Sequence, residues 1–121
     1  FAAILALVKT EDILYLEAER RIMGITHGPI ARRLLARWNL PPGTVEPIAG
    51  HHDFDPASDH AQATAIVHVA DVLVRAAGYG SGGDRRLPAV NPAALTCLQL
   101  QASDLPPLVD EMAVELSDFE C

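Results

Sequence analysis

Two adjacent histidines, His51 and His52, stand in the stretch PIAGHHDFD, with aspartates close behind them. Imidazole and carboxylate groups are ligands that divalent transition metals bind in proteins. The same composition is also typical of a helix end that faces water. The stretch therefore indicates either part of a metal site or a solvated helix end, and residues elsewhere in the chain have to decide between the two.

Two further polar residues could complete a metal site. His27 lies at the expected start of one helix, and Asp71 lies inside a helix that is otherwise apolar. His27 is 24 residues before His51, and Asp71 is 19 residues after His52. These separations are far longer than those of a local metal motif such as HExxH. The four residues can bind one ion of Zn, Mn or Fe only if the fold brings their helices together.

His68 and Glu19 have structural as well as functional interpretations. His68 and Asp71 are three positions apart and therefore share a helix face. His68 could be an extra ligand, a residue that supports a ligand, or a packed histidine, and we favour the last two. Glu19 could hydrogen-bond the turn at residues 24–26 or pair with an arginine, and we favour such a structural role.

The composition limits the class of protein. The chain has 121 residues, of which 50% are hydrophobic, so one domain over residues 1–121 is expected. A formal net charge of −7 argues against a protein that neutralises nucleic-acid phosphates. Arginines nonetheless cluster between residues 20 and 37, either as an anion-binding patch or, as we favour, on a solvated helix face. Cys97 and Cys121 are far apart and indicate no disulfide framework, so a reducing, cytoplasmic setting is expected.

The first residues, FAAILALV, are too few to cross a membrane, and they lack the basic region and the cleavage site of a secretory signal. We expect them to form a core helix that is cut at the start of the sequence. The chain would then be a fragment that lacks N-terminal helices.

Hydrophobic spacing and capping residues predict an all-α fold, a bundle of about six helices. Thr10, Thr26, Asn91 and Ser103 are the expected helix N-caps, and Gly24 is an expected helix end. Beyond the first residues, the expected helices cover approximately residues 11–23, 27–38, 42–52, 61–77, 92–100 and 104–116.

The helix expected over residues 27–38 has apolar residues at helical spacing. Ile30, Leu34, Leu35 and Trp38 are predicted to form its buried stripe, with Trp38 as an anchor in the core.

At this point the chain resembles a known family. The strings EAERRIMGITHGPIARRLLARWNLPPGTVEPIAGHH and AIVHVADVLV are similar to the C-terminal half of the HD-related output domain (HDOD), a bacterial signalling branch of the HD superfamily of metal-dependent phosphohydrolases. The resemblance covers roughly residues 11–78. The matching residues, in order, are Glu19, Gly24, His27, Trp38, Leu40-Pro41, His51-His52 and Ala70-Asp71.

The resemblance implies an HD-domain-like helical bundle and a set of metal ligands. In the metal-binding relatives, residues at the positions of His27, His51, His52 and Asp71 contribute to one metal ion or a close pair, here Fe, Mn or Zn. Those relatives also use a histidine and a His-Asp pair on preceding helices, which this sequence does not contain. If the preceding helices are missing only from this sequence, the set of metal ligands here is incomplete. If the natural protein lacks them, the protein has lost the ancestral hydrolysis. Whether any metal is bound stays open.

A second departure concerns the cyclic-dinucleotide phosphodiesterases of the HD-GYP branch. Their His-His pair is closely followed by a Gly-Tyr-Pro signature, whereas here the stretch DFDPASDH follows His51-His52. We interpret the later GYG at residues 78–80 as a coincidence, so the departure argues against that activity.

Three functions remain open. The first, which we favour, is a non-catalytic signalling module whose partners are other signalling proteins or domains, with homodimerisation as a further option. The second is a metal-dependent phosphohydrolase or phosphodiesterase that acts on a nucleotide or another phosphate ester. The third is the helical interaction half of a larger domain, without a site of its own.

Overall fold

The computed structural model describes residues 1–80 and 82–119, so Cys121 lies outside the described residues. The described residues form helices and connecting segments without a strand, which confirms the predicted all-α class. None of the described helices combines the length and the apolar character needed to cross a membrane. The helices are α1 (Ala2–Glu11), α2 (Tyr15–Met23), α3 (His27–Arg37), α4 (Pro42–Gly50), α5 (Ala61–Ala76), α6 (Pro92–Cys97), the 3-10 helix η1 (Ala102–Asp104) and α7 (Leu105–Ser117).

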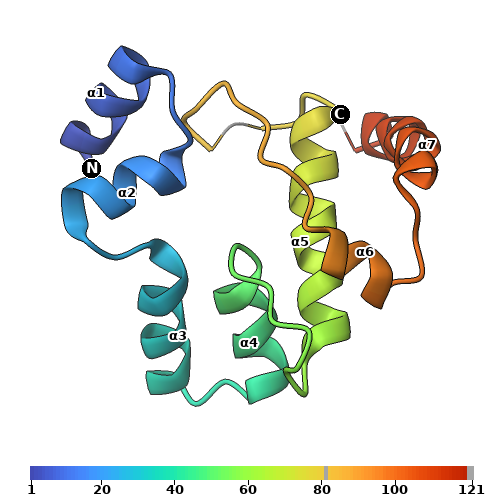
Figure 1. Cartoon of the computed structure of the whole chain (residues 1–121), viewed down its shortest axis with the longest axis horizontal. Helices are drawn as coiled ribbons and strands as arrows, with labels where there is room; N and C mark the ends of the chain where they lie inside the picture. The colour runs from blue at the N-terminus through green and yellow to red at the C-terminus, as the bar shows by residue number, and fades with distance from the viewer. Residues whose placement is uncertain (81, 120–121) are drawn as a thin grey trace.

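The helices follow one another around an open ring (Figure 1). α1 packs on α2, α3 packs on α4, and α4 packs on α5, which in turn carries α6 and α7. Residues 82–91 run from beside α2 back to α6 and close the ring on its upper side (Figure 1). The ring therefore places the start of α3 and the end of α4 opposite the middle of α5.

Two apolar clusters hold the two sides of the ring. One joins α1 to α2 through buried Ile4, Val8 and Ala18. The other surrounds α5, where Ala65 and Val69 pack against Ala94 of α6. Small residues at these positions let the helices approach closely. α5 is therefore the central element, as its long apolar sequence predicts.

The predicted helix ends are correct in some places and wrong in others. Gly24 ends α2 in the left-handed conformation, at a φ of 70°. The Asn91 side chain accepts a hydrogen bond from the Ala93 amide and caps α6, as predicted. Ser103 is not the cap of α7, because Asp104 occupies that position and forms a capping box with Gln101.

The first helix boundary is also corrected. α1 runs through Thr10, whose hydroxyl donates a hydrogen bond back to the Ala6 carbonyl within the same helix. Asp12 then ends α1 in the left-handed conformation, and α2 begins only at Tyr15. Thr10 is therefore not an N-cap: the good helix formers before it extend α1 across the position where a new helix was predicted to start.

The predicted buried stripe of α3 is wrong for three of its four residues. Ile30 and Leu34 are each 45% exposed and Trp38 is 64% exposed, so Trp38 is no core anchor. α3 packs on α4 through a different face, at Gly28, where an added Cβ would lie only 2.4 Å from the Ala49 carbonyl oxygen. Because the side of α3 that carries Gly28 faces α4, the apolar stripe faces outward.

Candidate metal centre

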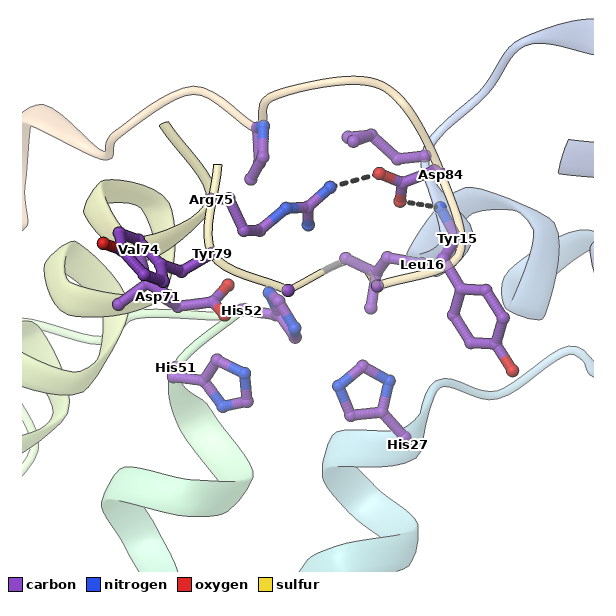
Figure 2. A pocket seen from close by; sticks show the side chains of 14 residues that line it. Tyr15, Leu16, His27, His51, His52, Asp71, Val74, Arg75, Tyr79 and Asp84 are labelled. Carbon is purple, nitrogen blue, oxygen red and sulfur yellow. Dashed lines mark hydrogen bonds and ion pairs between the residues drawn. The ribbon is translucent and has the colours of Figure 1, made fainter. Parts of the chain in front are cut away.

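The helices α2, α3 and α5 and the end of α4 meet at a pocket of about 420 Å³ (Figure 2). His27 is the first residue of α3, and His51 and His52 follow the last residue of α4. Asp71 lines the same pocket from α5. The fold thus brings all four predicted site residues to one pocket, despite their distance in sequence.

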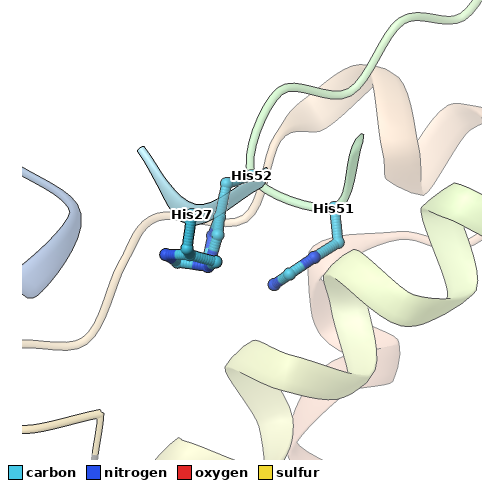
Figure 3. A group of neighbouring side chains, drawn as sticks. All are labelled: His27, His51 and His52. Carbon is cyan, nitrogen blue, oxygen red and sulfur yellow. The ribbon is translucent and has the colours of Figure 1, made fainter. Parts of the chain in front are cut away.

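Three of these residues form a close cluster. The rings of His51 and His52 have centroids 3.9 Å apart, and the His27 ring lies 4.9 Å from His52 and 5.9 Å from His51 (Figure 3). One possible ligand atom from each side chain lies within 4.8 Å of the others, and all three residues are half-buried. We call His27, His51 and His52 the histidine cluster.

Hydrogen bonds orient two rings of the histidine cluster. The buried Glu19 carboxylate accepts from the His27 backbone amide at 3.1 Å and from His27 Nδ1 at 2.7 Å. His51 Nδ1 lies 2.7 Å from the Ile48 carbonyl oxygen, which can only accept. When either ring is neutral, its proton is therefore on Nδ1, and Nε2 keeps its lone pair for a ligand. A histidine that binds a metal is commonly fixed in this way.

Glu19 also replaces the expected cap of α3. Thr26 occupies the predicted N-cap position, but its side chain makes no capping hydrogen bond. The Glu19 carboxylate instead accepts from the first amide of the helix, that of His27. Glu19 thus has a structural role, as favoured, but its partner is His27 and not the turn at residues 24–26 or an arginine. The same carboxylate also orients the His27 ring.

His68 of α5 bonds the backbone of the histidine cluster at His51. Its Nε2 accepts a hydrogen bond from the Asn91 amide at 2.9 Å, and its Nδ1 donates to the His51 carbonyl oxygen at 2.7 Å. Both ring nitrogens of this buried residue are thus occupied. Of the interpretations considered, the supporting, packed histidine agrees with the structure, and an extra ligand does not.

Burial sets the protonation state of His52. Desolvation, followed by the neighbouring His51 and His27, lowers the pKa of His52 to about 4, although Asp71 opposes the shift. His52 is therefore neutral at pH 7, the form in which imidazole binds a metal.

Asp71 takes a different place from the three histidines. Its side chain points toward them in the pocket (Figure 2), but it does not join the group of ligand atoms that lie within 4.8 Å of one another. The structure therefore brings together three of the four predicted ligands and leaves the carboxylate beside them.

A buried ion pair in the pocket wall was not predicted from the sequence. Arg75 pairs with Asp84, whose side chain is only 1% exposed, and Arg75 also donates to the Arg86 carbonyl oxygen at 2.6 Å. Asp84 accepts a further hydrogen bond from the Tyr15 amide at 2.6 Å (Figure 2). The available signal was an arginine in the otherwise apolar α5, since a buried cation needs a partner.

The donor set fits a divalent transition metal. Ligand atoms of the three clustered histidines lie within 4.8 Å of one another beside the pocket, and imidazole suits ions such as Zn and Fe. A site with three histidine ligands keeps a position open toward the pocket, whereas a closed structural zinc site has four protein ligands.

Comparison with known families agrees with this geometry. Residues 1–54 match the family model of the HDOD domain, which confirms the resemblance seen in the sequence. The match begins earlier and ends earlier than residues 11–78, so it includes Glu19 and the histidine cluster but not Asp71. No curated protein and no solved structure matches the chain.

Proposed function

We propose that this chain, whose residues 1–54 belong to the HDOD domain family, is a non-catalytic module of bacterial signalling that binds a divalent metal through His27, His51 and His52. The observation that carries the proposal is the preset orientation of two rings, each with Nδ1 engaged and Nε2 left for a ligand. The HD superfamily, to which HDOD is related, typically binds metals, which supports the same assignment.

The positions of the ligands suggest how a metal would regulate the module. Glu19 of α2 holds His27, whereas His68 of α5 holds the backbone of His51. When bound, the ion supplies a positive charge shared by ligands from both sides of the ring. Metal binding would therefore fix the α1–α2 pair relative to α5, and other signalling proteins or domains would recognise that arrangement.

The test is the metal content of protein purified without a chelator and without an immobilised-metal column, measured by mass spectrometry. We expect close to one Fe, Mn or Zn ion for each chain. The double variant His51→Ala, His52→Ala should lose it. His60→Ala is the matched control, because His60 is a half-buried histidine at the start of α5 that lies outside the histidine cluster.

The free energy of unfolding, measured with and without metal, gives a second test of metal binding. Zinc at a hundred times its dissociation constant should raise the free energy of unfolding by about 2.7 kcal/mol in the parent and in His60→Ala. The double variant should show no such increase. A parent protein that neither carries a metal nor gains stability from Zn, Mn or Fe would overturn the proposal.

The pocket itself supports a second candidate, a metal-dependent phosphohydrolase. Its volume of about 420 Å³ beside the histidine cluster leaves room for a phosphate ester. Among the described residues that line it, however, Arg75 is the only arginine or lysine, and Asp84 already engages it. Apart from a bound metal, none of these described lining residues would then supply a free cationic side chain to stabilise developing phosphoryl charge.

A substrate screen separates the two functions. We expect metal-loaded protein to release no product from phosphomonoesters, phosphodiesters or nucleotides beyond the rate of the double variant. Turnover that is present in the parent and in His60→Ala, and absent from the double variant, would favour the hydrolase.

A further inference from the structure

The outer face of α3 is an unusual surface. Ile30, Leu34 and Trp38 are four positions apart, so they form one stripe along the helix, and each is exposed by 45% or more. Arg33 and Arg37 lie beside this stripe and are also exposed. We call these five residues the α3 face.

No described part of the chain covers the α3 face. α3 packs on α4 through its opposite side, where Gly28 meets Ala49 and Arg32 pairs with Glu46 at 2.8 Å. Within the described residues, Arg33 and Arg37 take part in no ion pair, whereas Arg32 does. Exposed tryptophan and arginine beside aliphatic residues are the composition of a protein-binding surface.

α7 carries a surface of the opposite charge. Residues 92–119 contain no lysine or arginine, and Asp110, Glu111, Glu115 and Asp118 are all exposed on α7. Val114, 67% exposed, lies among them. We call these five residues the α7 face. Glu111 and Glu115 are four positions apart, where like charges repel each other, and an opposing cationic face would relieve this repulsion.

We propose that the α3 face of one copy of this chain binds the α7 face of a second copy. The two faces are complementary in charge, and each combines exposed charged side chains with exposed apolar ones. Within one copy α3 and α7 lie on opposite sides of the molecule (Figure 1), so the two faces can meet only between copies. Because two different surfaces meet, the contact is heterologous. It involves none of the histidine cluster and is independent of metal binding.

Sedimentation velocity at increasing protein concentration tests the proposal in the full chain. We expect the parent to associate at low ionic strength and to dissociate as salt screens the charges. Two variants should each weaken association at least tenfold: Arg33→Glu with Arg37→Glu, and Asp110→Lys with Glu111→Lys and Glu115→Lys. Trp38→Ala should also weaken it, because it removes the largest apolar group of the α3 face.

The mixture of the two charge-reversed variants is the decisive sample. Each variant alone presents two faces of the same sign, but in an equimolar mixture the acidic α3 face meets the basic α7 face. The mixture should therefore associate again. Lys9→Glu with Arg85→Glu is the control, because it changes the net charge as much as the α3 variant does, at exposed residues outside both faces. Circular dichroism confirms that each variant folds.

Three results would overturn the proposal. The first is a parent that stays monomeric at every concentration. The second is association that neither reversal weakens, or that the control weakens equally. The third is a mixture that remains monomeric while both variants are folded.

Discussion

At the scale of single residues, the convergence of three candidate metal ligands could be predicted from the sequence, but the bonds that orient them could not. His27, His51 and His52 converge as expected, because helix ends face the pocket. The role of Glu19 depends on α2 turning back toward α3, and that of His68 depends on the position of Asn91. Both roles depend on contacts between different elements, and the spacing of residues along one helix cannot predict such contacts.

Removal of the Glu19 carboxylate should affect both stability and metal binding. In Glu19→Ala, the His27 amide and Nδ1 lose their shared acceptor. Loss of the capping interaction should lower the free energy of unfolding by about 1 kcal/mol, measured by urea denaturation. Loss of ring orientation should weaken Zn binding roughly 10- to 100-fold, measured by calorimetric titration. Thr26→Ala is the control, because the Thr26 side chain makes no capping bond; an equal loss of affinity there would contradict the assignment to Glu19.

The lowered pKa of His52 predicts a pH dependence for the metal-free protein. The pKa of His52 is about 4 in the folded chain, against 6.5 for an unperturbed histidine. Between these values the unfolded chain binds a proton that the folded chain does not, so the free energy of unfolding should fall as the pH falls from about 6.5 to about 4. His52→Asn removes the titrating group. Urea denaturation at pH 7 and at pH 4.5 should therefore show a smaller decrease for the variant than for the parent, and equal decreases would contradict the prediction.

At the scale of the elements, the type and approximate extent of most helices could be predicted, because apolar spacing and caps such as Asn91 are local signals. The break between α1 and α2 could not, since Thr10 resembles an N-cap but bonds within α1. The outward stripe of α3 could not be predicted either. Apolar spacing shows that a face exists, but the contact at Gly28 decides which face is buried.

The contact at Gly28 gives a prediction for the pairing of α3 with α4. In Gly28→Ala, the new Cβ would meet backbone, the Ala49 carbonyl oxygen at 2.4 Å, so the helices must separate. Overpacking of this kind should cost about 1–3 kcal/mol in the free energy of unfolding, measured by urea denaturation. Zn affinity should also fall, because His27 is the neighbouring residue on α3.

Gly43→Ala is the matched control for this change. A Cβ at Gly43 would meet nothing closer than His60 Cε1 at 3.9 Å. Alanine is the better helix former, so this variant should be neutral or gain roughly 0.5 kcal/mol. If both glycine variants lost the same stability, helix propensity or the denatured state would explain the effect, and the close approach of α3 to α4 would not.

At the scale of the whole molecule, the ring is closed by contacts that the sequence does not indicate. Asp84 lies in a Gly-rich segment that predicts only a loop, yet it bonds Arg75 of α5 and the Tyr15 amide of α2. An exposed pair, Asp12 with Arg86 at 3.4 Å, makes a second link nearby. Which residues join such a network depends on where the loop returns in space, so the composition of the loop alone cannot predict them.

The buried Asp84 link should dominate the stability of the closed ring. Asp84→Asn leaves the Arg75 cation without its ionised partner, and breaking a buried pair in this way should cost about 3 kcal/mol. Because Asp84 also joins the loop to α2, amide hydrogen exchange in α1 and α2 should accelerate more than exchange in α5. Urea denaturation and exchange mass spectrometry measure the two effects.

Asp12→Asn separates the buried link from the exposed one. Asp12 has a φ of 50°, a conformation that asparagine tolerates, and its pair with Arg86 is exposed on both sides. Such pairs contribute about 0–1 kcal/mol, so this variant should stay close to the parent in stability and exchange. A large loss in Asp12→Asn with a small one in Asp84→Asn would mean that the ring is held at its surface. The reverse order would mean that the buried Asp84 carboxylate joins α2 to α5 and thereby keeps the two sides of the histidine cluster together.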